Sequence, residues 1–314
     1  MDMSGLELAR RFYEHCAPLL RQRIPDVMER AAVGLVGEGS ECFGCDDGLS
    51  QDHDWGPGFC LWLPRKQLQQ ESERIEAAFA ALPESFEGMP SRLLPARRRG
   101  RVGPLAIEDF YLGLTGLSTP PQDWRQWLAV PEWRFAAAVN GRVFHDGAGI
   151  FSRWRSVLEQ GYPEDVRLKK MAARCMQMAQ SGQYNLQRCR ARRDAVAASM
   201  AQGRFVESTL SLLYLLNRRY MPFYKWAWAL AGRLPVLGPA ICEKLHRLVS
   251  LPAAECCAAR ALVPTVEEIC FLMAAELRRQ GLSAVPHDWL WDHGPALMRH
   301  VRTPELLRMD LLQE

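Results

Sequence analysis

The stretch Val33-Gly-Leu-Val-Gly-Glu-Gly-Ser-Glu-Cys-Phe-Gly-Cys-Asp-Asp-Gly-Leu-Ser-Gln-Asp-His-Asp-Trp-Gly-Pro-Gly-Phe59 decides the predicted fold of this chain. An apolar segment at 31–36 is typical of a buried strand, and a second strand is predicted over 53–63. Between them, Gly39 and Ser40 form a turn that can approach a phosphate closely, because glycine has no side chain and consecutive N–H groups bind anions. The stretch therefore predicts two strands joined through a phosphate-binding turn.

Two acids, Asp52 and Asp54, stand at the start of the second predicted strand. Residues i and i+2 of a strand project from the same face, so the two carboxylates would lie side by side while His53 faces away. Neighbouring like charges repel unless a cation binds between them, and Mg²⁺ prefers such oxygen ligands together with phosphates. Combined with the phosphate-binding turn, the pair predicts phosphoryl or nucleotidyl transfer supported by Mg²⁺ or Mn²⁺.

At these four residues the chain resembles the nucleotidyltransferase superfamily that includes DNA polymerase β, kanamycin nucleotidyltransferase and the minimal nucleotidyltransferases. Three later segments are similar to an uncharacterised bacterial branch of it, known only as a domain of unknown function: 143–146, 162–166 and 220–226. The resemblance implies an α+β fold. In that fold a small mixed-sheet nucleotidyltransferase domain is followed by an all-helical bundle domain that closes the cleft.

The resemblance also implies the chemistry of the site. Asp52 and Asp54 would hold Mg²⁺ (or Mn²⁺), and Gly39 and Ser40 would bind the phosphates of a nucleoside triphosphate, for which ATP is expected. A nucleoside monophosphate would pass to an acceptor hydroxyl with release of pyrophosphate. The acceptor stays open among a small molecule, a protein side chain and an RNA end.

Members of the superfamily commonly place a third acid on a neighbouring strand, and here its identity stays open. The expected strand, 101–107, has no acid in its interior. Glu108 follows it but is more typical of the first turn of the next helix. Asp46 and Asp47 are typical turn residues. Asp194, in the helical half, is a further alternative by resemblance to the antibiotic-modifying relatives, and the third acid can also be missing.

The segment Tyr220-Met-Pro-Phe-Tyr-Lys-Trp226 combines a cation with aromatic stacking surfaces. By resemblance, the helical half would bring Arg218, Lys225 or Tyr224 to the triphosphate or to the acceptor. The alternative is aromatic packing with the cations at its rim.

Length and composition set the limits of the prediction. A chain of 314 residues suits two domains, predicted as 1–147 and 148–314. The formal net charge is only +3, so general attraction to nucleic acid is not predicted. Arginines nonetheless cluster at 92–101 and 188–193, and such patches can meet a polyanion. Runs of this kind are more often solvated loops.

Cysteine usage and hydropathy predict a cytoplasmic protein without a membrane partner. Ten cysteines in a chain that lacks the pattern of a signal peptide are most simply reduced thiols. No stretch reaches the ~20 apolar residues that span a bilayer. Cys42 and Cys45 have the spacing of a metal knuckle, but no second pair follows, so they are expected to be small apolar residues of the loop.

Periodicity and helix signals predict the remaining elements. Helices are expected at 6–21, 65–82, 109–117, 163–180 with an end at Ser181-Gly182, 187–202, 204–220, 263–280, and 286–312 with a break at Gly294-Pro295. An edge strand is expected at 140–144.

Two further functions stay open from the sequence. The first is a catalytically weakened member of the superfamily that binds nucleotide as a sensor or interaction module, because the third acid is uncertain. The second is an RNA-binding helical protein that keeps the fold as a scaffold; its affinity would fall steeply with salt.

Overall fold

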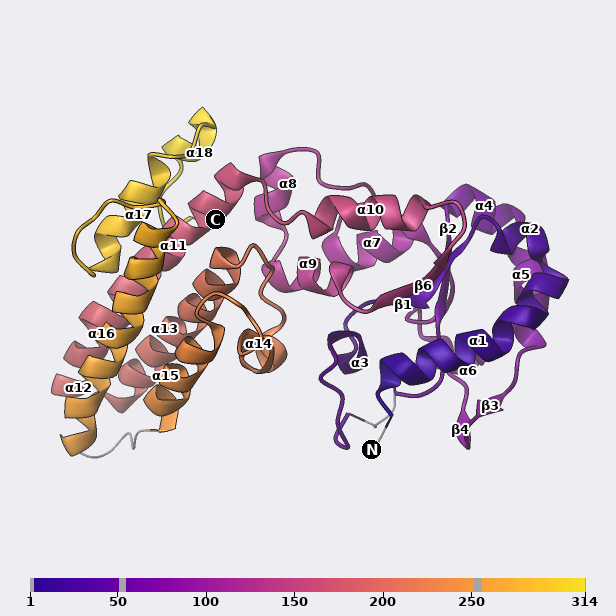
Figure 1. Ribbon diagram of the computed structural model, residues 1–314, viewed down its shortest axis with the longest axis horizontal. Helices are drawn as coiled ribbons and strands as arrows, with labels where there is room; N and C mark the ends of the chain where they lie inside the picture. Colours follow the sequence, from indigo (N-terminus) through magenta and orange to yellow (C-terminus); the bar gives the residue numbers. More distant parts are fainter. Residues whose placement is uncertain (1–2, 51–54, 251–255, 314) are drawn as a thin grey trace. The chain divides into compact units, whose positions relative to one another are not determined.

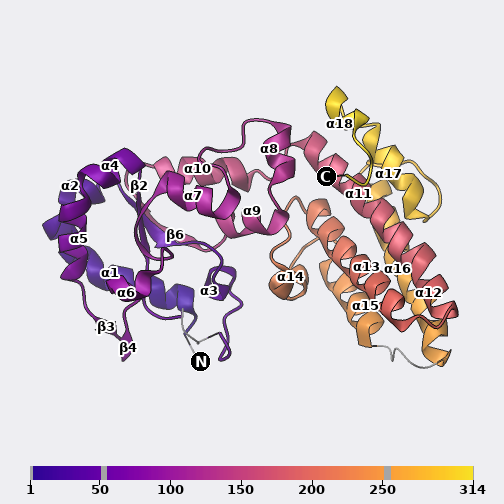
Figure 2. The same cartoon turned by 180° about the vertical axis from the view of Figure 1, so that it is seen from behind.

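The computed structural model describes residues 3–50, 55–250 and 256–313, and the side chains of the same residues except 256–261. The chain divides into two compact units, shown in Figures 1 and 2. Unit 1 comprises Met1–Gln122 and Val130–Gln160, and unit 2 comprises Asp123–Ala129 and Gly161–Glu314. The predicted boundary after residue 147 falls inside the last stretch of unit 1.

Unit 1 is built on a four-stranded mixed sheet in the order β5-β2-β1-β6. The strands are β1 (Ala32–Leu35), β2 (Cys60–Leu63), β5 (Gly103–Ala106) and β6 (Arg142–Asp146). Strand β1 runs antiparallel to β2 and β6, while β2 runs parallel to β5. The predicted α+β class with a small mixed sheet is confirmed, as are the strands expected at 31–36, 101–107 and 140–144.

Helices cover both faces of this sheet (Figure 1). On one face, α1 (Gly5–Arg23) places Phe12 5.7 Å from Phe59, between ring centroids. On the other face, Trp62 of β2 stacks on Phe151 of α10 (Ile150–Glu159) at 4.1 Å. Unit 1 also contains α2 (Pro25–Met28), α3 (Ser40–Phe43), α4 (Arg65–Gln70), α5 (Ser72–Ala80), β3 (Ser85–Phe86), β4 (Met89–Pro90), α6 (Pro95–Arg98), α7 (Ile107–Thr115) and α9 (Glu132–Val139).

The first helix illustrates why the local sequence folds as it does. The Ser4 hydroxyl accepts the Glu7 N–H (3.3 Å) and so caps the amino end of α1. Leu8 and Phe12, one turn apart, are fully buried, and Arg23 in the last turn complements the helix dipole. The helix predicted at 6–21 is therefore confirmed.

Unit 2 contains helices and no strand among its described residues. It comprises α8 (Trp124–Ala129), α11 (Glu164–Met178), the π-helix η1 (Ala179–Leu186), α12 (Gln187–Ala191), α13 (Ala195–Leu216), α14 (Tyr224–Ala231), α15 (Gly238–Ser250), α16 (Cys256–Arg279), α17 (Leu290–Met298) and α18 (Pro304–Arg308). Helix α11 packs against both α13 and α17. None of the described helices is long and apolar enough to span a membrane.

Ser181-Gly182 does not end a helix, as the sequence had suggested. The chain continues from α11 through η1 into α12. Gly182 lies against α13, where an added Cβ would be 2.9 Å from Phe205 Cγ and closer to Cδ2 and Cε2 of the same ring. Here glycine permits close packing and does not break the helix.

Three other predicted elements differ from the structure. The break predicted between the helices 187–202 and 204–220 lies at 192–194 instead, so α13 is one long helix that starts before residue 204. Helix 65–82 is divided into α4 and α5 at Glu71. Gly294-Pro295 lies inside α17 and does not break it, and Gly294 is in close contact with Met176 of α11.

Gly34 of β1 is required by the close approach of β6. A Cβ on Gly34 would lie 2.9 Å from Val143 Cα and closer to Arg142 O. We expect Gly34→Ala to lower the free energy of unfolding by about 1–3 kcal/mol through overpacking. Gly113→Ala in α7, where an added Cβ meets nothing within 4 Å, should raise it by about 0.5–1 kcal/mol.

Urea denaturation followed by circular dichroism measures both free energies. Equal effects of the two substitutions would contradict the steric explanation.

Candidate functional site

One edge of the sheet of unit 1 gathers the loop that carries Gly39 and Ser40. Gly34 of β1 pairs with Cys60 at the amino end of β2, and Leu35 pairs with Arg142 at the amino end of β6. Because β1 is antiparallel to both neighbours, the loop after β1 lies where β2 and β6 begin. Strand β5 is parallel to β2, so it also begins at this edge.

The loop after β1 is held by Asn140, which the sequence analysis did not single out. The Gly37 N–H donates to Asn140 Oδ1 (3.0 Å), and Asn140 Nδ2 donates to the Gly37 carbonyl (2.6 Å). Gly37 has a φ of 138°, which favours glycine. The Gly141 N–H donates to the Cys42 carbonyl (2.8 Å). The chain before β6 therefore positions the Gly-Ser turn.

Gly39 and Ser40 lead into the short helix α3. Gly39 is in extended conformation (φ −64°, ψ 144°), and Ser40 is the first helical residue. Neither N–H donates a hydrogen bond to another described residue. A side chain at Gly39 would overlap with the Glu41 carboxylate. The turn thus presents backbone donors and the Ser40 hydroxyl at the edge of the sheet.

Glu41 forms a buried ion pair with Arg92. Glu41 Oε1 lies 3.0 Å from Arg92 Nη1, and the residues are only 6% and 5% exposed. The Arg92 N–H also donates to the Pro57 carbonyl (2.8 Å), and its Cβ lies against Gly58. The pair therefore ties α3 to the segment just before β2. The expectation that Arg92 belongs to a basic patch is wrong, because its charge is buried and paired.

The thiols beside this ion pair are neutral. Burial raises the pKa of Cys60 to about 12 and holds the pKa of Cys42 well above its usual value. A thiolate at either position would lose its hydration in this buried environment. This agrees with the interpretation of Cys42 as a small apolar residue.

Two acids of the loop have structural partners. Asp46 Oδ2 accepts the Gly5 N–H (2.6 Å) and the Trp55 Nε1–H (3.1 Å). Asp47 Oδ1 accepts the N–H groups of Leu49 and Ser50, both at 3.0 Å. Asp46 therefore joins the start of α1 to the residue that follows Asp54 in the sequence, and Asp47 forms the predicted turn.

The predicted metal ligands Asp52 and Asp54, together with His53, lie outside the described residues. The strand that was expected to begin at 53 starts at Cys60 within the described chain, so the prediction is wrong for 55–59. Gly56 has a φ of 137° and is followed by Pro57, and neither favours a regular strand there. The side-by-side arrangement of Asp52 and Asp54 stays a prediction.

Two further acids considered as the third carboxylate, Glu108 and Asp194, accept N–H groups at the start of helices. Glu108 is in the first turn of α7, and its Oε2 accepts the Arg65 N–H (2.8 Å) beyond the carboxyl end of β2. It therefore lies at the opposite edge of the sheet. Asp194 is the N-cap of α13, where Oδ1 accepts the Ala197 N–H (2.9 Å), and belongs to unit 2.

Arg218 and Lys225 lie on the surface of unit 2. Arg218 Nη1 pairs with Glu164 Oε2 (2.9 Å), and Lys225 Nζ lies 4.7 Å from the centroid of the Trp226 ring. Tyr224 is 77% exposed. The predicted role of Arg218, Lys225 and Tyr224 at a triphosphate stays a prediction.

The described residues, from which 51–54 are missing, contain no group of three His, Cys, Asp or Glu that could hold a metal ion. At the Gly-Ser edge, Glu41 and Asp46 have protein partners and Glu38 is exposed. The Ser40 hydroxyl is a suitable oxygen donor. A metal site here would therefore depend on Asp52 and Asp54.

Comparison with known proteins gives one similarity. A family described as "Domain of unknown function (DUF4037)" matches residues 127–227, which run from α8 into α14. The three later segments singled out in the sequence lie inside this range. No curated protein and no solved structure matches the chain.

The buried ion pair gives a test of how the edge is held together. Arg92→Met leaves the Glu41 carboxylate buried without a partner, so we expect the free energy of unfolding to fall by about 3–5 kcal/mol. Arg97→Met, at a more exposed arginine nearby, should change it by less than about 0.5 kcal/mol. Urea denaturation measures both.

The double variant Arg92→Met/Glu41→Leu separates charge from packing. It should recover much of the loss, because no unpaired charge remains. A double variant that is less stable than Arg92→Met would show that the loss comes from packing.

Proposed function

We propose that this chain is a nucleotidyltransferase that uses Mg²⁺ or Mn²⁺. It would move a nucleoside monophosphate from a nucleoside triphosphate, with ATP as the expected donor, to an acceptor hydroxyl and release pyrophosphate. In this proposal Gly39 and Ser40 bind the phosphates, and Asp52 and Asp54 hold the metal. The acceptor is a small molecule, a protein or an RNA.

One observation carries the proposal: the antiparallel pairing of β1 with β2. It brings the loop after β1 and the start of β2 to the same edge of the sheet. In sequence, Gly39-Ser40 directly follows the first of these strands, and Asp52-His53-Asp54 precedes the second. A topology with parallel strands would have separated the two motifs by the length of the sheet.

The ion pair of Glu41 with Arg92 supports phosphate binding at the Gly-Ser turn. The Glu41 carboxylate lies beside Gly39 and would repel a phosphate, but Arg92 neutralises it from the buried side. The N–H groups of Gly39 and Ser40, which donate to no other described residue, and the Ser40 hydroxyl can then act without a competing negative charge. A bound divalent cation would neutralise charge on the phosphates during transfer.

The catalytically weakened sensor is the second candidate function. Glu108 caps α4 at the far edge of the sheet, Asp194 caps α13, and β5 has no acid. Neither Glu108 nor β5 therefore places a third carboxylate at the edge that carries Gly39. Nucleotide binding without turnover follows from this candidate.

Labelled nucleotides distinguish the two functions. Purified protein is incubated with labelled ATP, GTP, CTP or UTP, Mg²⁺ and cell extract. We expect label to be transferred by the wild-type protein. Asp52→Asn and Asp54→Asn should each lower the rate of transfer by at least about a hundredfold, because the bound metal lowers the barrier by several kcal/mol. Binding of nucleotide without transfer would favour the sensor.

Asp47→Asn is the matched control. An asparagine oxygen can accept the same N–H groups, so the turn at Leu49 and Ser50 should persist and the transfer should be unchanged. Loss of transfer in Asp47→Asn would show that the variants act by disturbing the loop and not by removing a metal ligand. A third outcome is binding of RNA that weakens with salt and does not change in Asp52→Asn or Asp54→Asn. This outcome would contradict both the transferase and the sensor and would favour the RNA-binding scaffold.

A further inference from the structure

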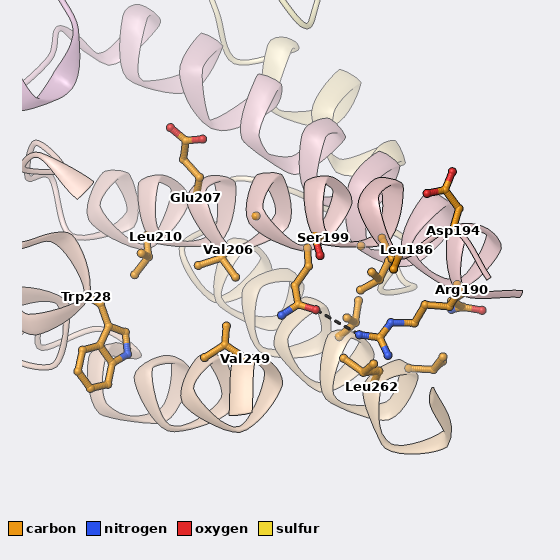
Figure 3. A pocket seen from close by; sticks show the side chains of 18 of the residues that line it. Leu186, Arg190, Asp194, Ser199, Val206, Glu207, Leu210, Trp228, Val249 and Leu262 are labelled. Carbon is orange, nitrogen blue, oxygen red and sulfur yellow. Dashed lines mark hydrogen bonds between the residues drawn. The ribbon is translucent and has the colours of Figure 1, made fainter. Parts of the chain in front are cut away.

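Unit 2 contains a large groove between α13 and the helices α15 and α16, with a volume of about 1420 Å³ (Figure 3). Its lining follows α13 from Ala195 to Leu210, a length of about 22 Å at the helical rise. The volume exceeds the roughly 300–1,000 Å³ of a usual ligand pocket, so the groove has room for an extended molecule.

The long walls of the groove are apolar. Val206 and Leu210 project from α13 toward Val249 of α15, and Leu262 of α16 continues the opposite wall (Figure 3). Trp228 stands at the Leu210 end with half of its surface exposed. A hydrocarbon body in this groove would remove apolar surface of both partners from water.

A cation stands at the other end. Arg190 reaches from α12 into the groove, and its Nη2 donates to Gln202 Oε1 (3.4 Å) (Figure 3). The Arg190 Nε is buried and has no hydrogen-bond partner among the described residues. None of their salt bridges includes Arg190. Burial lowers the pKa of this guanidinium, which reflects the cost of a desolvated charge.

The acids of the lining do not balance this charge. Asp194 accepts the Ala197 N–H as a helix cap, and its carboxylate points away from the groove. Glu207 also projects to the far side of α13 (Figure 3). An anion at Arg190 would therefore meet an unpaired donor and no facing carboxylate.

We infer that this groove binds a single-chain anionic amphiphile, such as a long-chain fatty acid. The hydrocarbon chain lies along Val206 and Leu210, and the anionic head group accepts hydrogen bonds from Arg190. This site lies within unit 2 and does not depend on the proposed nucleotidyl transfer.

Binding is measured with full-length protein and the fluorescent fatty acid cis-parinaric acid, displaced by hexadecanoate or by hexadecan-1-ol. The wild-type protein should bind hexadecanoate at one site. Arg190→Gln should weaken the binding of hexadecanoate by about tenfold, because the charged hydrogen bond to the carboxylate is lost, and should leave the binding of hexadecan-1-ol unchanged. Val206→Trp, which fills the groove, should weaken both ligands at least as much.

Arg188→Gln is the matched control. Its guanidinium lies 3.9 Å from the centroid of the Tyr184 ring, and it does not line the groove, so affinity should equal that of the wild type. Absence of wild-type binding, or equal effects of Arg190→Gln and Arg188→Gln, overturns the inference. Binding only to phosphatidylglycerol vesicles also overturns it. If Val206→Trp does not fold, the comparison of the two arginine variants still decides.

Discussion

The candidate edge of unit 1 depends on one buried ion pair, that of Arg92 with Glu41. Its arginine holds the carbonyl of Pro57 through the backbone and the carboxylate of Glu41 through the side chain. Two chain segments far apart in sequence thereby keep a fixed separation at the edge of the sheet. A buried charge that loses its partner is strongly destabilising, so neither segment can move alone. The same ion pair neutralises the negative charge of Glu41 beside the Gly-Ser turn. One interaction thus serves both the stability of the edge and the phosphate binding proposed for it.

Much of the fold can be predicted from the sequence because its signals are local. The helix at the amino end has a Ser cap and a regular apolar face, and β1 is a short apolar run, so both follow from spacing. The failures have a tertiary cause. Gly182 looks like a helix end until Phe205 is seen against it, and Arg92 looks like a surface charge until Glu41 is found beside it.

Some residues of the candidate site can likewise be recognised from the sequence, and others cannot. Gly39 and Ser40 could be singled out from their type and order, whereas Asn140, which holds their loop, could not. Its side chain bonds to Gly37 across more than a hundred positions of sequence, and an asparagine at the end of a helix is an ordinary residue. Asp194 shows the converse, since an acid that attracts a catalytic interpretation acts as a helix cap.

The π-helix η1 determines whether Arg190 points into the groove of unit 2. Each residue of a helix turns the following side chains by about 100°, so the length of η1 sets the direction in which α12 aims its side chains. If the same residues 179–186 took up α-helical geometry, the side chains of α12 would turn by about 100° about the helix axis, and Arg190 would no longer point into the groove. The geometry of this turn, and not only the residue types of the walls, therefore determines whether the groove has a charged end.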